Sequence, residues 1–207
     1  MNLENSKWIG EYEAEVFKHF FVVNDFRRIL SLEHNSVLNI DIDVDSTACL
    51  FFSDYSGVVT EINVKLNTNS SCELYGLFKS TNEKTHVITN VTHNGNNSYC
   101  NQDFRFVNRE SISSFKGLIN IPENVTGCES HMSNRNLLLD EVSRAYAKPE
   151  LDIRNSDVIC SHGSTTGTLD QEQLFYIQSR GISYRDSVNI LIEAFYSDIK
   201  NKMTLET

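Results

Sequence analysis

Apolar and polar residues alternate along most of this chain of 207 residues, which is the period of a β-strand with one buried face. The alternation is plainest at 37–44 and 62–66. Further runs of this kind lie at 72–78, 86–92, 98–107, 112–121, 144–147 and 151–160, with turn-rich segments such as 67–70 and 94–97 between them. The pattern predicts a mainly β fold. Periodicity alone leaves a sandwich, a barrel and an irregular solenoid open.

Residues at the two ends of the chain follow different patterns. Over 7–34 the aromatic and aliphatic positions fit one face of a short helix, and a strand fits them nearly as well. Near the C-terminus, Asp170 is placed to cap a helix that Gly181 would close, and Ser183 is placed to start a second helix. These patterns divide the chain into a short N-terminal segment (1–35), a strand core (36–168) and a helical domain (169–207).

The second helix presents a broad apolar surface. On one stripe of it lie Tyr184, Val188, Leu191, Phe195 and Ile199, with Ile192 beside them. Off the stripe lie Ile190, Ala194 and Tyr196. A surface of this width can pack on the strand core and still leave area for a partner, and packing on the core alone is the simpler alternative.

Composition and charge exclude several classes of function. The formal net charge is -10 and the pI is about 5.0, whereas nucleic acids and anionic membranes require clustered Lys and Arg. No apolar run of membrane-spanning length is present, and the N-terminus lacks the features of a secretion signal. The five cysteines are odd in number and scattered, which favours reduced thiols. We therefore expect a cytoplasmic protein whose partners are proteins, metals or small molecules, with no nucleic acid and no membrane.

Cys160 and His162 are the first candidate site. In an extended segment, residues two positions apart point to the same face, so this thiol and imidazole would lie side by side. Together they could bind iron, zinc or a transferred sulfur species. A buried Cys beside a hydrogen-bonded His is the alternative, and the spacing does not separate the two. The small polar residues 163–168 are expected to form the turn that leads into the helix at Asp170.

Cys128 and His131 form a second pair of this kind. With Cys160 and His162 they would complete a four-ligand zinc site, although the second arm is shorter than the usual zinc spacing. A hydrolase that uses Cys and His would need the two side chains in hydrogen-bond contact and an orienting third group, which nothing in the sequence marks. The glycines form no phosphate-binding loop, so nucleotide hydrolysis by this chain is not expected.

Four sequence segments occur in a fixed order in the C-terminal part of the chain. They are SNRNLLL at 133–139, KPELDI at 148–153, CSHGSTTGTLD at 160–170, and LFY with SRGI within 174–182. In this order they resemble the SufB/SufD family of SUF iron–sulfur cluster assembly subunits, and within it the C-terminal half of the SufD branch. The SufB branch is similar but looks to carry Glu-His-Glu at 161–163 and a cysteine at the position of Ser143.

The resemblance implies a right-handed parallel β-helix for the strand core, and a C-terminal helical domain that docks the SufC ATPase. It also implies a non-enzymatic scaffold that pairs with SufB, shares a transient iron–sulfur cluster with it, and is served indirectly by a cysteine desulfurase system. His162, with Cys160 beside it, would be a ligand of iron or of the cluster at the SufB interface. The residues expected to dock SufC are Leu174, Phe175, Tyr176, Arg180, Leu191 and Phe195.

The chain departs from the family pattern in two respects. SufD chains are substantially longer and begin with a helical region, whereas about 35 residues precede the first clear strand here. His131 stands where the family more often has Gln, so His131 and Cys128 are retained as additional metal-ligand candidates. A metal-dependent or Cys-His enzyme on a β-solenoid, and a homodimer that pairs its own sheet edges, are the alternative functions. The sequence gives no support for a bound reduced flavin.

Overall fold

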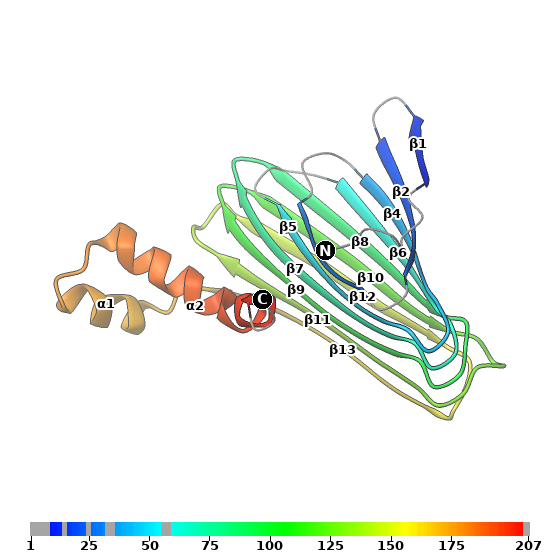
Figure 1. Cartoon of the computed structure of the whole chain (residues 1–207). Helices are drawn as coiled ribbons and strands as arrows, with labels where there is room; N and C mark the ends of the chain where they lie inside the picture. The colour runs from blue at the N-terminus through cyan, green and yellow to red at the C-terminus, as the bar shows by residue number, and fades with distance from the viewer. Residues whose placement is uncertain (1–8, 14–15, 24–25, 32–35, 55–58, 205–207) are drawn as a thin grey trace.

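The computed structural model describes residues 9–13, 16–23, 26–31, 36–54 and 59–204. In this part of the chain, thirteen strands form two sheets that lie face to face, and two helices follow them (Figure 1). No helix in these ranges is long and apolar enough to cross a membrane.

Sheet 1 contains, in spatial order, β1 (Ile9–Glu13), β2 (Val16–Val23), β4 (Ser36–Ile42), β6 (Val59–Leu66), β8 (Lys84–His93), β10 (Ile112–Ile121) and β12 (Arg144–Ile153). Sheet 2 contains β13 (Val158–Thr168), β11 (Cys128–Leu138), β9 (Tyr99–Arg109), β7 (Ser71–Thr81), β5 (Thr47–Asp54) and β3 (Phe26–Ser31). From β2 onward the chain alternates between the two sheets and neighbouring strands are parallel, whereas β1 pairs with β2 in the antiparallel sense. Each pair of successive strands is therefore one coil of a solenoid.

The interior between the sheets is built from alternate residues of each strand. Buried positions alternate with more exposed ones along β4, β6 and β8, as expected for strands with one face in a core. Side chains of one kind stack from coil to coil, for example Phe78 on Phe106 with ring centroids 4.9 Å apart. The expected mainly β fold with a helical C-terminus is confirmed, and parallel pairing selects the solenoid among the three arrangements that periodicity left open.

Asparagine and aspartate residues occupy one corner of the solenoid in successive coils. Asp45, Asn69 and Asn97 have φ angles of 57°, 57° and 56°, a left-handed conformation that Asn and Asp adopt more readily than other non-glycine residues. The Asn97 amide donates to Asn69 Oδ1 at 3.2 Å, and the Asn69 amide donates to Asp45 Oδ1 at 2.7 Å. Part of the Asn-rich composition therefore serves the turns between the sheets.

The structure decides between the helix and the strand that both fit 7–34, because the described residues there form β1, β2 and β3. Three other expectations about local structure are wrong. Strands β5 and β11 are missing from the expected set, because adjacent Phe51 and Phe52 are both buried in β5 and polar Ser130 and Asn134 take interior positions in β11. The single strand expected at 151–160 is divided at 154–157 between the end of β12 and the start of β13. The turn expected at 163–168 is the second half of β13.

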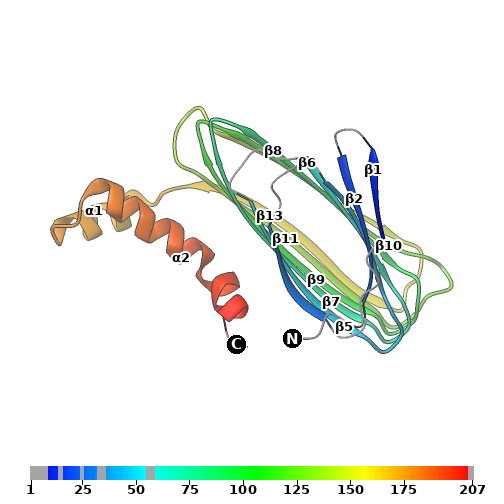
Figure 2. The same cartoon turned by 45° about the horizontal axis from the view of Figure 1, so that its top comes forward.

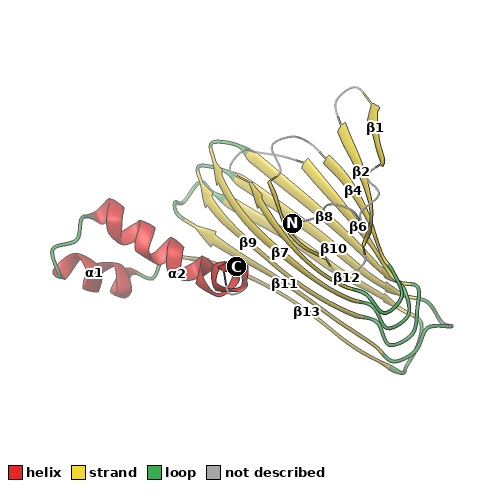
Figure 3. Ribbon diagram, in the orientation of Figure 1, coloured by secondary structure: helices red, strands yellow, loops and turns green. Residues whose placement is uncertain are grey.

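The C-terminal helices begin and end close to the expected residues. They are α1 (Gln171–Ser179) and α2 (Tyr184–Thr204), coloured red in Figure 3. The Asp170 side chain accepts hydrogen bonds at 2.9 and 3.2 Å from two backbone N–H groups of the first turn, and Gly181 follows the helix with φ of +85°. The sequence alone therefore predicts the residues at which α1 begins and ends.

The packed face of α2 is rotated relative to the expected stripe. The residues of α2 buried against sheet 2 are Val188, Ile192, Tyr196 and Ile199. Tyr184, expected on the stripe, is 59% exposed, whereas Tyr196, expected off it, donates to the Phe78 carbonyl at 2.8 Å. Figure 2 shows α2 running back alongside the solenoid from its junction with α1.

Candidate functional site

The last coil of the solenoid is open. β12 and β13 end their sheets, and among the described strands each has one neighbour, so the outer edge of each presents backbone N–H and C=O groups to a further strand. The interior face of this coil is also uncovered, because Leu151 is 37% exposed although its register partner Ile119 is fully buried. Pro149 within β12 fits an edge strand, since proline cannot donate to a further strand.

Cys160 and His162 point from β13 toward this open interior face. They are the register partners of Ser130 and Met132, which are interior residues of β11. Cys160 is half-buried against the main core, and burial raises the pKa of its thiol, whereas His162 is exposed. The expected shared face is therefore present, with a shielded thiol next to an accessible imidazole. Both groups are ligands that iron and zinc accept.

Cys128 and His131 lie on opposite faces of β11, as residues three apart in a strand do. Cys128 is buried with its sulfur 3.3 Å from Ser98 Oγ, whereas His131 is on the outer face. One ion cannot bind both, which removes the geometric basis for the four-ligand zinc site. In the described ranges, no group of three or more His, Cys, Asp or Glu side chains is placed to hold a metal ion.

The outer face of β11 and β13 carries a hydrogen-bonded chain that sequence reasoning missed. His131 Nδ1 lies 2.7 Å from Ser161 Oγ, and His131 Nε2 lies 2.8 Å from Glu129 Oε1. The spacing of Glu129 and His131 was a readable signal, because residues two apart share a face. The contact of His131 with Ser161 could not be predicted from the sequence, because it depends on the register of β11 with β13. The chain orients His131 on the face of the sheet opposite to His162.

The expected docking residues of the helical hairpin fall into two groups. Phe175 and Tyr176 are 74% and 60% exposed, and the Arg180 guanidinium lies 5.1 Å from the centroid of the Tyr176 ring. Leu174 is buried, and Leu191 and Phe195 are half-buried against the cluster between α2 and sheet 2. The first group is exposed and available to a partner, whereas Leu174 and Phe195 of the second group hold the hairpin on the solenoid.

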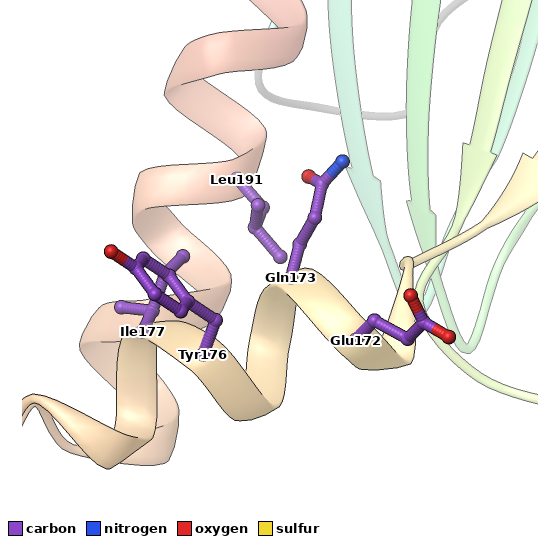
Figure 4. Close-up of a pocket in the computed structure, with 5 residues that line it drawn as sticks. All are labelled: Glu172, Gln173, Tyr176, Ile177 and Leu191. Carbon is purple, nitrogen blue, oxygen red and sulfur yellow. The ribbon is translucent and has the colours of Figure 1, made fainter.

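An open hollow of about 520 Å³ lies between the two helices. Its lining residues are Glu172, Gln173, Tyr176, Ile177 and Leu191 (Figure 4). The Leu191 side chain extends from α2 toward Gln173 of α1, and Tyr176 lies beside Ile177 on α1. A mostly apolar hollow with the exposed Tyr176 side chain in its lining is typical of a protein-binding surface.

Arg105 of β9 fixes the hairpin on the solenoid, and sequence reasoning missed it. Its guanidinium donates to Asp103 at 2.9 Å and to Asp198 of α2 at 3.0 Å, and it also bonds the Phe195 carbonyl. Burial alone would lower the pKa of Arg105, but the Asp103 and Asp198 carboxylates raise it above its usual value. No sequence signal links Arg105 to α2, because the contact spans 93 residues.

These features define a class of protein: a parallel β-solenoid with an open, Cys- and His-bearing end and a docked helical hairpin. The family model described as "SUF system FeS cluster assembly, SufBD core domain" matches residues 14–195. That range covers most of the chain, so the chain belongs to the SufBD family, as the sequence resemblance predicts.

Individual relatives agree with this membership. "Iron-sulfur cluster assembly protein SufD" of Escherichia coli (strain K12) is 30% identical over 223 residues, covering 90% of this chain and 51% of that protein. A SufBD family protein of Synechocystis sp. is 36% identical over 91 residues, covering 44% of this chain and 20% of the relative. The Porphyra purpurea relative is 26% identical over 140 residues, covering 67% and 29%. The chain is thus SufD-like and spans about half the length of its Escherichia coli relative.

Proposed function

We propose that the open end of the solenoid is the working surface of a scaffold subunit in SUF iron–sulfur cluster assembly, and that the chain is not an enzyme. The observation that carries the proposal is the position of Cys160 and His162 beside two unpaired strand edges. A scaffold needs metal ligands on a surface that a partner can cover, and the last coil combines the two. The names of the relatives describe assembly proteins of the same family.

The partner proposed for the open end is a SufB-like subunit. Its strands would continue the sheets beyond β12 and β13, satisfy the free backbone groups and cover Leu151. The cluster would be cargo held between the two subunits. His162 is the stronger ligand candidate, because its imidazole is accessible. Cys160 is the weaker one, because its raised pKa means that a bound metal must displace the thiol proton.

The partner proposed for the helical hairpin is a SufC-like ATPase. Phe175 and Tyr176 would be its contact residues, since both are exposed aromatic side chains of α1 and Tyr176 also lines the hollow between α1 and α2. Leu174 and Phe195 would act through the shape of the hairpin, because they pack in the cluster between the hairpin and sheet 2. Leu191 lines the hollow and would contribute to its apolar floor. The proposed docking surface is therefore narrower than the set expected from the sequence.

The alternative of a Cys-His enzyme finds less support in the site. A nucleophilic cysteine requires a lowered pKa, and burial shifts the pKa of Cys160 in the opposite direction. The homodimer alternative uses the same open edges as the proposed pairing with a SufB-like subunit. Measuring which complex forms therefore distinguishes the homodimer from the heterodimer.

The test is co-expression of this chain with the SufB and SufC proteins of its own organism, followed by purification and assay of iron and acid-labile sulfide. His162→Ala should lower both contents several-fold in an intact three-protein complex. His131→Ala is the matched control, because His131 lies on the adjacent strand but on the opposite face. The iron and sulfide contents of this variant should equal those of the wild type.

Two outcomes would contradict the proposal in different ways. If His162→Ala leaves the iron and sulfide contents of an intact complex unchanged, His162 is not a ligand. The partner would then supply the ligands. A chain that forms only dimers of itself, measured by light scattering in the presence of SufB, would favour the homodimer.

A further inference from the structure

The interior of the solenoid contains polar side chains without a protein partner. Among the described residues, the buried atoms that lack a hydrogen bond include Oγ1 of Thr60 and of Thr89, Oγ of Ser130, and both the oxygen and the nitrogen of the Gln102 amide. All four residues are fully buried. A buried polar group without a hydrogen bond is costly, and native proteins satisfy such groups with protein atoms or with ordered water.

Thr89 of β8 and Gln102 of β9 face each other across the interior. His93 and Ser98, at the turn between these strands, are opposite because His93 Nδ1 lies 2.7 Å from Ser98 Oγ. Thr89 lies four residues before His93, and Gln102 lies four residues after Ser98. Because the two strands lead into and out of the same turn, equal steps from the turn reach opposite positions.

A separate contact in the next coil also indicates that Thr89 and Gln102 face each other. A Cβ atom built on Gly117 would lie 2.3 Å from Met132 Sδ, so these two residues face each other. Gly117 is the register partner of Thr89, and Met132 is the register partner of Gln102. Gln102 and Thr89 therefore occupy opposite interior positions, one coil before the contact between Met132 and Gly117.

Ser130 and Thr60 extend this pair in both directions. Each lies one strand away and two residues out of register, Ser130 beside Gln102 in sheet 2 and Thr60 beside Thr89 in sheet 1. Strand geometry separates such Cα atoms by about 8 Å, a distance that two polar side chains and a water molecule can span. The four residues form a diagonal polar line beside the apolar side chains of the core.

We propose that Thr89, Gln102 and Ser130 line an internal binding site for ordered water. The lining offers two hydroxyls and one amide, which are neutral and include both donors and acceptors, so its ligand is a small neutral molecule with the same capacity. Water meets that description and gives each unpaired atom a partner. Met132 has two register partners, Gln102 in β9 and His162 in β13, and its side chain packs toward Gly117. Met132 therefore separates the Gln102 end of the site from the open end of the solenoid. The inference does not depend on the proposed function.

The direct test is a crystal structure at a resolution that shows water, together with oxygen-17 relaxation dispersion to count long-lived water molecules in solution. We expect ordered water within hydrogen-bond distance of Gln102 and Thr89, and at least one long-lived molecule in the wild type. A core without water density, with the Gln102 amide bonded to the backbone, would overturn the inference.

Stability provides a second test that separates a hydrated site from a dry one. In a hydrated site, Thr89→Val removes one anchor of the water, so the count of long-lived molecules falls and the melting temperature does not rise. In a dry site, the same change removes an unpaired hydroxyl and raises the melting temperature by several degrees, which would overturn the inference. Gln102→Met repeats the test from the opposite wall, in case one variant folds poorly.

The matched control is Thr85→Val, in the same strand and also buried. The Thr85 hydroxyl has a partner, since it lies 2.5 Å from Ser80 Oγ. This variant should lower the melting temperature and leave the water count unchanged. Met132→Ala should shorten the residence time of the internal water by opening the site toward His162. An unchanged residence time in that variant would contradict the separating role of Met132.

Discussion

The guanidinium of Arg105 in β9 donates a 3.0 Å hydrogen bond to the Asp198 carboxylate of α2, and the two ends of this contact are very unequal in burial. The Arg105 side chain is 4% exposed, whereas that of Asp198 is 64% exposed. Water screens the Asp198 end, while the Arg105 end depends on its protein partners. With the hydrogen bond from Tyr196 to the Phe78 carbonyl, this contact helps to set α2 on sheet 2.

Replacement of the two partners should therefore have unequal effects. Arg105→Met leaves Asp103 and the Phe195 carbonyl without their donor, and we expect a loss of about 2–4 kcal/mol in the free energy of unfolding. Asp198→Asn should cost less than about 1 kcal/mol. Urea denaturation of both variants measures this, and equal losses would show that the buried end does not dominate.

Stability should fall on mild acidification because of His93. Burial lowers the pKa of His93 to about 4 from its usual 6.5, so the unfolded chain takes up a proton at a higher pH than the folded chain. The contribution of neutral His93 is complete above about pH 6.5 and is lost as the pH falls toward about 4, by roughly 3 kcal/mol in total.

His93→Asn tests this pH dependence, because the Asn side chain can still bond Ser98 but does not titrate. Its free energy of unfolding, measured by urea denaturation across the same pH range, should change less than that of the wild type. If the free energy of unfolding changes equally with pH in the two proteins, groups other than His93 cause the acid sensitivity.

The close approach of Gly117 and Met132 predicts a compensating pair of substitutions. Gly117→Ala places a methyl group against Met132 Sδ and should cost about 1–3 kcal/mol, because the end of the Met132 side chain must move away among its buried neighbours. In the background of Met132→Ala the same change should cost much less, since the obstructing atoms are gone. Four chemical denaturation curves complete this cycle, and additive losses would mean that the two side chains do not meet.

The two proposed partner surfaces should be separable by single substitutions. Phe175→Asp places a charge on an exposed side chain of α1, and we expect at least a tenfold loss of affinity for the SufC-like ATPase with SufB binding retained. Tyr146→Asp changes a side chain that is 60% exposed on edge strand β12. We expect this variant to lose affinity for SufB and to retain its affinity for the SufC-like ATPase. Titration calorimetry with each partner checks both, and a variant that weakens both partners alike would contradict separate surfaces.

Local geometry accounts for what the sequence by itself determined. Alternation located most strands, and the shared face of Cys160 and His162 follows from a two-residue step along an extended chain. The helix cap at Asp170 and the break at Gly181 also depend on neighbouring residues alone. Strand β11 was missed because its interior positions carry Ser130 and Asn134, which the alternation of hydrophobic residues does not mark.

The tertiary structure alone decided how these elements come together. A period of two residues is the same in parallel and antiparallel sheets, so the pattern could not reveal that β12 and β13 end a solenoid. The contacts of Ser161 with His131 and of Arg105 with Asp198 join residues 30 and 93 positions apart. Such pairings follow from register and from the packing of the whole interior, which no single segment of the sequence contains.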